Sequence, residues 1–142
     1  MEIKNYVLAF PTTGKTDLVD ITREVAVRVR DSDIVEGSAL IFVPGSTAAL
    51  TTIEYEDGVI EDLKEAIARL APENLRYRHD ARWGDGNGYA HVRAALLGPS
   101  LTIPVIEGKL VLGTWQQVIL CDFDNRPRKR QVVVQVTGQG DR

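Results

Sequence analysis

The two histidines of the chain, His79 and His91, lie at either end of a polar segment that also contains Asp85 and Asn87. Three glycines interrupt this segment, and glycine backbone lets a chain curl until side chains that are apart in sequence converge. Imidazole and carboxylate groups bind divalent metals, so we predict a zinc or magnesium site built from His79, Asp85 and His91. The alternative is that Asp85 and Asn87 are turn and cap residues and that His91 is a packed helix histidine.

A second group of candidate residues follows Gly45, where Ser46 and Thr47 separate two predicted strands. Small hydroxyl residues beside a glycine can present backbone N–H and side-chain O–H groups to a phosphate, although an ordinary sharp turn has the same composition. The sequence contains neither the lysine of a P-loop nor the glycine fingerprint of a dinucleotide site. Glu54, at the end of the second strand, is either a candidate acid or base or an exposed strand-end carboxylate.

A third group is the pair Gln116 and Gln117, which begins a strand after Trp115. Adjacent strand residues point to opposite faces, so one of the two amides should point inward or into a cleft and find partners there. We expect Trp115 to fill the core, with stacking on an aromatic substrate as the alternative. Cys121 lies in an apolar run, which indicates a buried structural thiol rather than a nucleophile.

Alternating or continuous apolar runs bounded by turn residues predict the strands that must position these groups. The predicted strands span residues 3–10, 39–43, 48–53, 101–106, 109–114, 117–123 and 131–136. Glu107 and Gly108 indicate a hairpin between two of them. The basic cluster Arg126, Arg128, Lys129 and Arg130 precedes the last strand. We expect it to be the solvated start of that strand, and an anion-facing edge is the alternative.

Helices are predicted where apolar residues recur every three or four positions. Residues 59–70 have the clearest helical spacing, and residues 90–97 form a shorter helix. Residues 18–30 fit either a strand or a helix, and Asp20 as a possible N-cap favours the helix, with Gly37 ending this region. Residues 73–88 are predicted to be a long polar loop. The pattern predicts an α+β fold, an antiparallel β-sandwich or partly closed barrel with two or three helices.

Length and composition limit the organisation and the function. The 142 residues fit a single domain spanning residues 1–142. A net charge of −3 argues against broad nucleic-acid binding. One cysteine excludes an intrachain disulfide, and the N-terminus resembles no signal peptide. No apolar run approaches the roughly 20 residues that a membrane span requires, so we expect a cytoplasmic protein with no membrane partner.

Three stretches resemble, in order and at compatible spacing, the signatures of the YjbQ family, often described as secondary thiamine-phosphate synthases. They are residues 37–57, 85–102 and 113–124. The resemblance implies an α+β fold around a sandwich or barrel, assembled as a homotrimer. It implies a polar cleft lined by the three signatures, with a metal ion in some members. The implied activity joins a pyrimidine pyrophosphate to a thiazole phosphate and releases pyrophosphate.

The resemblance assigns roles to individual residues. The implied catalytic residues are His91, Asp85 and Glu54, and a phosphorylated small molecule would contact Ser46, Thr47, Asn87, Ser100 and Gln116. Many relatives carry histidine where Gly45 stands here, and some carry it at the positions of Gly84 and Tyr89. Only His79 and His91 remain in this chain to bind a metal. Two hypotheses follow: a thiamine-phosphate synthase-like transferase, or a trimer that binds a metabolite or metal without turnover.

Overall fold

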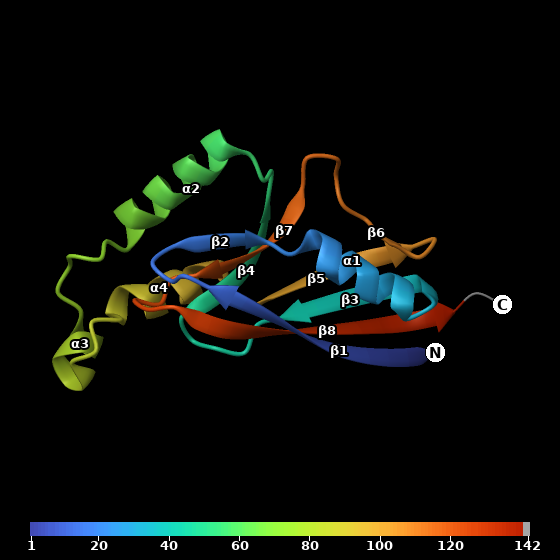
Figure 1. Cartoon of the computed structure of the whole chain (residues 1–142), viewed down its shortest axis with the longest axis horizontal. Helices are drawn as coiled ribbons and strands as arrows, with labels where there is room; N and C mark the ends of the chain where they lie inside the picture. The colour runs from blue at the N-terminus through green and yellow to red at the C-terminus, as the bar shows by residue number, and fades with distance from the viewer. Residues whose placement is uncertain (141–142) are drawn as a thin grey trace.

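The computed structural model describes residues 1–140 and contains two antiparallel sheets (Figure 1). The five-stranded sheet has the order β1-β8-β3-β5-β6, and the three-stranded sheet has the order β2-β7-β4. The strands are β1 (Glu2–Thr12), β2 (Asp17–Asp20), β3 (Ile34–Phe42), β4 (Ala48–Ile53), β5 (Ser100–Ile106), β6 (Lys109–Leu110), β7 (Gln117–Asp122) and β8 (Arg128–Gly140). The helices are α1 (Thr22–Asp31), α2 (Asp57–Leu70), α3 (Arg78–Trp83) and α4 (Gly88–Leu97). The predicted α+β class with antiparallel strands is confirmed.

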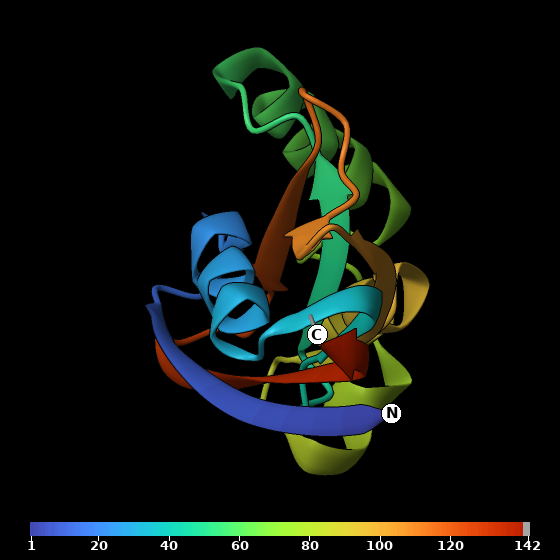
Figure 2. The same cartoon turned by 90° about the vertical axis from the view of Figure 1, so that its right-hand side faces the viewer.

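The five-stranded sheet curls around α1, which lies on its concave side (Figure 2). Strict alternation along β8 produces this face, because Val132, Val134 and Val136 all point inward and are buried. Helix α1 contributes Val25 and Val29 to the same core. Alternate residues of β8 and residues four apart in α1 therefore pack together in one apolar cluster.

Strand β7 lies at the centre of the three-stranded sheet and is buried on both faces. Val118 and Leu120 join the core shared with α1, whereas Ile119 and Cys121 join a second core beneath α2 and α4. The prediction of a buried Cys121 is confirmed, and burial raises the pKa of its thiol to about 12. A thiol with so high a pKa stays protonated and is a poor nucleophile at neutral pH.

Several sequence predictions need correction. Residues 18–30 contain both a strand and a helix, since β2 ends at Asp20 and α1 begins at Thr22. The Thr22 N–H donates a hydrogen bond to the Asp20 carboxylate. Gly37 does not end a helical region but lies within β3, where a Cβ would come within 1.9 Å of the Thr137 carbonyl oxygen. Strand β6 is only two residues long.

A fourth helix, α3, occupies part of the segment predicted as a loop, so the expected two or three helices become four within the described residues. Its six residues are too few to show an apolar period, and no side chain of α3 is buried. Among the helices of residues 1–140, none is both long and apolar enough to cross a membrane.

Candidate functional site

Helices α3 and α4 meet at a tight turn that brings the two histidines together. Helix α3 ends at Trp83 and is capped by Gly84, whose positive φ of 68° suits glycine, and α4 begins at Gly88. The carboxylate of Asp80 accepts a hydrogen bond of 2.8 Å from the Gly88 N–H and so joins the two helices. A Cβ at Gly88 would lie 2.5 Å from the Cβ of Tyr77, so only glycine allows this approach. Both histidines therefore project from short elements at one turn.

The side chains of His79, Asp85 and His91 converge at this turn, as the sequence predicted. The ring centroids of His79 and His91 are 4.3 Å apart, and His79 Nδ1 lies 3.3 Å from the Asp85 carboxylate. One ligand atom from each of the three residues lies within 4.8 Å of the other two. Within residues 1–140 the buried His79 Nδ1 has no hydrogen-bond partner of good geometry. We name these three residues the histidine cluster.

The histidine cluster fits a divalent metal by donor type and by position. Two imidazoles and one carboxylate match the three protein ligands of a catalytic zinc site, which keeps a fourth position open. Zinc bonds of about 2.1 Å place tetrahedral ligand atoms roughly 3.4 Å apart, so the three groups would close slightly around an ion. Magnesium prefers oxygen ligands and fits two imidazoles less well. Both histidines line a concavity of about 450 Å³ together with Arg76 and Arg78.

A second polar cluster lies beneath the β7–β8 turn and is buried. Asp122 accepts hydrogen bonds of 2.7 and 2.8 Å from Nε and Nη2 of Arg130, and a further bond from the Thr12 hydroxyl. Asp124 accepts from the Thr47 hydroxyl at 2.9 Å and from Nη2 of Arg128 at 3.0 Å. We name these carboxylates and their partners the carboxylate network.

The environment lowers the pKa of both carboxylates. Burial by itself raises the pKa of Asp122, but hydrogen bonds from Arg130 and Thr12 outweigh it, so the net shift is downward. Asp124 behaves in the same way, with Arg128 and Thr47 as the main partners that oppose the effect of burial. The two side chains therefore remain ionised and hold the guanidinium groups in place.

The predicted phosphate-binding hydroxyls have different environments. Thr47 is only 5% exposed, and its hydroxyl donates to Asp124 and accepts a bond of 2.6 Å from Arg130 Nη2. Both its donor and an acceptor site are thus used inside the protein. Ser46 is exposed at the preceding position of the turn. Asn87 is buried and accepts a bond of 3.0 Å from the Asn125 N–H, which ties the histidine cluster to the β7–β8 turn.

The structure does not bring the remaining predicted site residues to the histidine cluster. Glu54 follows the last residue of β4, whereas Thr47 precedes its first residue, so roughly 17 Å of strand separates the two ends. Gln116 lies near Glu54, since its amide donates to Thr52 at 3.2 Å. Figure 1 shows the β6–β7 loop beside the start of α2, away from α3 and α4. Ser100, exposed, begins β5 opposite Phe42. A single chain therefore does not bring Glu54 and Gln116 to the histidine cluster, although Thr47 of the first signature bonds to Asp124 of the third.

The predictions for Trp115 and for part of the basic cluster fail, whereas one of the two glutamines has a hydrogen-bond partner as expected. Trp115 does not fill the core but is 73% exposed in the β6–β7 loop. Gln116 is also exposed, while Gln117 accepts a bond of 2.8 Å from the Tyr55 N–H. The basic cluster is solvated at Arg126 and Lys129, but Arg130 is 9% exposed because its guanidinium pairs with Asp122. From the sequence Arg130 looks like a surface charge, because its carboxylate partner lies 8 residues away at the end of a strand in the other sheet.

Sequence reasoning assigned no role to several polar residues that the structure buries. Arg93 is buried on α4, donates to the Ala71 carbonyl oxygen at 2.9 Å, and stacks 4.8 Å from the ring centre of Tyr89. Asp122 and Asp124 follow an apolar strand directly, a pattern that could have marked them as carboxylates placed at the end of a buried strand.

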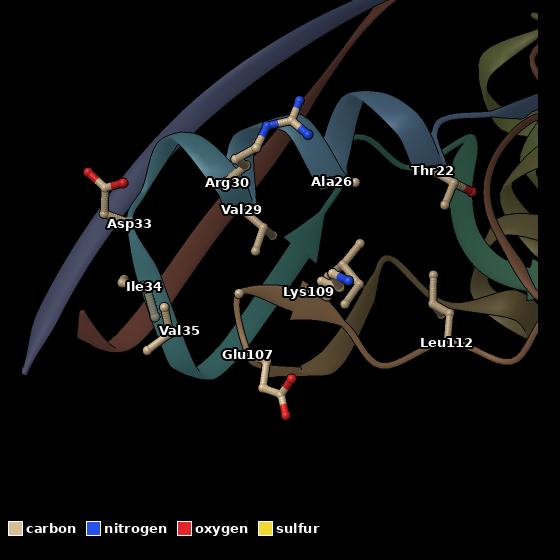
Figure 3. Close-up of a pocket in the computed structure, with 12 residues that line it drawn as sticks. Thr22, Ala26, Val29, Arg30, Asp33, Ile34, Val35, Glu107, Lys109 and Leu112 are labelled. Atoms are coloured by element: carbon tan, nitrogen blue, oxygen red, sulfur yellow. The ribbon is translucent and has the colours of Figure 1, made fainter. Parts of the chain in front are cut away.

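A larger cavity of about 770 Å³ lies between α1 and the β5–β6 turn (Figure 3). Its lining includes the buried side chains of Val29 and Ile34 and contains none of the predicted site residues. In Figure 3 the charged ends of Arg30 and Glu107 point away from the space between the helix and the turn. Volume alone identifies no ligand, so we place the candidate site where groups able to do chemistry converge, at the histidine cluster.

Comparison with known sequences reveals extensive similarity. A family model described as "UPF0047 protein YjbQ-like" matches residues 6–139. A UPF0047 protein of Archaeoglobus fulgidus is 40% identical over 127 residues, which cover 89% of this chain and 96% of that protein. The UPF0047 protein YugU of Bacillus subtilis is 36% identical over 132 residues, covering 92% and 97% of the two chains.

Solved structures have the same fold. A YbjQ-like protein of unknown function from Sulfolobus solfataricus superimposes with a TM-score of 0.87 at 36% identity, covering 97% of this chain and 100% of that one. An uncharacterised conserved protein of Clostridium acetobutylicum gives a TM-score of 0.85 at 32% identity, covering 93% and 99%. The similarity thus extends over nearly the whole chain in both sequence and structure.

Proposed function

Because this chain belongs to the UPF0047 family of YjbQ-like proteins, we propose that it binds a divalent metal ion at the histidine cluster and a phosphorylated small molecule beside it. The observation that supports this proposal is the convergence of His79, Asp85 and His91, with one ligand atom of each within 4.8 Å of the others. The buried His79 Nδ1, without a partner of good geometry in residues 1–140, is a donor atom still available to an ion.

The ion proposed for this site is zinc, since two of its three ligands would be imidazoles. When bound there, such an ion supplies a Lewis acid that offsets negative charge on phosphate oxygens. The protein's own contribution is to hold the three ligands on one rigid turn, through the Asp80 bond to Gly88 and the Asn87 bond to Asn125. Arg76 and Arg78 line the same concavity and add positive charge for a phosphate.

The reaction proposed from the family resemblance is thiamine-phosphate synthesis. A pyrimidine pyrophosphate would be joined to a thiazole phosphate, and pyrophosphate would leave. Developing charge on the leaving group is the reason that such a displacement needs cationic groups near the pyrophosphate. His91 and Asp85 are the residues we propose beside the reacting groups.

Binding without turnover is the second candidate function, and the position of Glu54 favours it. Glu54 was the proposed acid or base, yet it lies at the far end of β4 from the histidine cluster. A general base must come within hydrogen-bond distance of the proton that it removes. A single chain therefore supplies no Glu54 carboxylate to the proposed metal site.

Two measurements test the proposal. Titration of metal-free protein with zinc chloride in a calorimeter should show one ion per chain, and His91→Ala and Asp85→Asn should both remove saturable binding. Glu61→Gln, an exposed carboxylate on α2, is the matched control and should bind like the parent. Release of pyrophosphate from the two substrates then separates transferase from binding protein. Equal zinc affinity in parent and His91→Ala protein would contradict the metal site.

We also propose that the chain forms a homotrimer. Exposed apolar side chains gather on the outer face of the five-stranded sheet, where strand pairing sets exposed Val7 and Phe42 on either side of half-buried Val133. Exposed apolar patches of this kind commonly mark subunit interfaces. Light scattering should give the mass of three 15.7 kDa chains, about 47 kDa, and Phe42→Glu should lower it. A mass of one chain for the parent would contradict the proposal.

A further inference from the structure

The edge of β8 is open over a short stretch near its start. Strand β1 pairs with β8 as far as Thr12 opposite Arg128, but β3 pairs with it only as far as Phe42 opposite Val133. The chain leaves β3 and turns at Pro44, so residues 128–132 have a strand neighbour on one side only within the described structure. A concavity of about 370 Å³ opens here. It is lined by Pro44, Arg128, Lys129, Arg130 and Gln131, and we name it the basic pocket.

Two guanidinium groups of the basic pocket are held rigidly from below. Arg130 uses Nε and Nη2 to bind Asp122, and Nη2 also donates to Thr47. Its Nη1 makes no hydrogen bond within residues 1–140 and lies 3.1 Å from the place that a Cβ of Gly45 would occupy. Glycine at this position therefore leaves Nη1 uncovered by a side chain. A fixed guanidinium loses little rotamer entropy when it binds a planar or tetrahedral anion.

Arg128 has a similar arrangement. Its Nη2 binds Asp124 at 3.0 Å, and its buried Nε has no partner in the part of the chain that the structure describes. Buried donors are nearly always satisfied in folded proteins, so an orphaned guanidinium N–H beside a pocket indicates a missing acceptor. Lys129 is exposed next to it and forms no ion pair with residues 1–140.

The positive charge of the basic pocket exceeds the negative charge of the carboxylates beneath it. The basic pocket is lined by three cations, Arg128, Lys129 and Arg130, whereas the carboxylate network beneath it carries only Asp122 and Asp124, so one positive charge remains unbalanced. A phosphate group presents three strong acceptor oxygens and so can use the free N–H groups of Arg128, Lys129 and Arg130 together, whereas a carboxylate presents only two oxygens. Open N–H groups of a sheet edge can add further donors to such a site.

We propose that the basic pocket binds the phosphate or pyrophosphate group of a small-molecule ligand. The assignment rests on the proposed function for the class of ligand, and it moves the phosphate from Ser46 and Thr47 to Arg128, Lys129 and Arg130. Thr47 then acts as a positioning residue, because its hydroxyl orients Arg130 and Asp124 instead of contacting the anion. Asn125 connects the two sites, since its amide donates to the Asp85 carbonyl oxygen and its N–H donates to Asn87.

Calorimetry with inorganic pyrophosphate on metal-free protein tests this assignment. Lys129→Gln and Arg128→Gln should each weaken binding about tenfold, the effect of losing one charge-assisted hydrogen bond. Arg126→Gln removes the same charge two residues away without touching the pocket lining, so it should bind within about twofold of the parent. Lys129 is exposed, so its variant tests the pocket even if Arg128→Gln, which leaves Asp124 without that partner, folds poorly.

The same titration separates this assignment from the metal site. Pyrophosphate binding that survives His91→Ala but falls in Lys129→Gln supports the basic pocket, even if zinc fails to bind and the metal proposal falls. Binding that is lost in His91→Ala and unchanged in Lys129→Gln would place the anion at the histidine cluster and overturn the assignment. Acetate should not compete at the same concentration. A short single-stranded RNA that competes more strongly than pyrophosphate would overturn the small-molecule assignment.

Discussion

The histidine cluster and the carboxylate network lie at the same end of the three-stranded sheet, but they differ in how completely their polar atoms are used. In the carboxylate network, Asp122 and Asp124 are fully buried, and each accepts several hydrogen bonds from fixed partners. In the histidine cluster, the three side chains are half-buried or exposed, and His79 Nδ1 has no partner of good geometry in the described residues.

This difference indicates different roles. Buried ionised groups stabilise a fold only when every partner is present, because desolvation is otherwise uncompensated. A converging set of groups with unused hydrogen-bonding capacity costs little stability and remains available to a ligand. We therefore expect substitutions in the carboxylate network to change folding first, and substitutions in the histidine cluster to change binding first.

The largest effect on stability is expected for Asp122→Ala. Removal of this carboxylate takes away the closest ion-pair partner of the buried Arg130 and leaves it the Thr47 hydroxyl and an Asp124 oxygen 3.8 Å away, and breaking a buried ion pair costs about 3–5 kcal/mol. Urea denaturation measures the loss, with Asp62→Ala on the exposed face of α2 as the control, expected within about 0.5 kcal/mol of the parent. A loss as small as that of the control would show that Arg130 finds another partner.

Acidification should weaken the carboxylate network next. The folded-state pKa values of Asp122 and Asp124 are lowered, so their contribution is present above the unfolded value of about 3.9 and is lost as pH falls through the folded values. Unfolding free energy measured between pH 6 and pH 2, as an experimental range, should drop steeply at the acid end. In Asp122→Asn the unfolding free energy should fall less steeply at low pH. An unchanged pH dependence in this variant would show that Asp122 does not contribute to the acid sensitivity.

A smaller effect is expected for Asn87→Ala, because Asn87 joins the two regions. The variant loses the 3.0 Å bond to the Asn125 N–H, a cost of about 1–2 kcal/mol. It should also weaken zinc binding, since the turn that carries Asp85 loses an anchor. Asn125→Ala, which removes only an exposed bond to the Asp85 carbonyl oxygen, should cost less stability. Full zinc affinity in Asn87→Ala would show that the two regions are uncoupled.

The smallest effect on stability is expected for His91→Ala. His91 is half-buried, so its removal should change the unfolding free energy by no more than about 0.5–1 kcal/mol while removing zinc binding. Thermal unfolding and zinc calorimetry on this one variant compare the two properties directly. A large fall in melting temperature with unchanged zinc affinity would make His91 a packing residue and would reverse the contrast between the two regions.

Features that depend on neighbours in sequence were predictable. Alternation identified the central part of β8, helical spacing identified α2, and His79, Asp85 and His91 converge because the glycine turns between them fold the chain back on itself. The clear failures arise where a residue's environment comes from another element. Trp115 looked like a core residue, yet the loop that carries it projects from the sheet.

The sequence by itself therefore determined the α+β class, most strands and the local histidine cluster, because each follows from periodicity or from short chain separation. Only the tertiary structure decided that Arg130 meets Thr47 across 83 residues and that Glu54 lies far from His91. The physical reason is strand register: pairing of β4 with β7 places Ala48 opposite Asp122, and so puts Thr47 beside Asp124 and Glu54 at the opposite end. Register depends on which faces of the paired strands are buried together, and β4 and β7 are far apart in sequence with no turn joining them, so only the folded chain sets it.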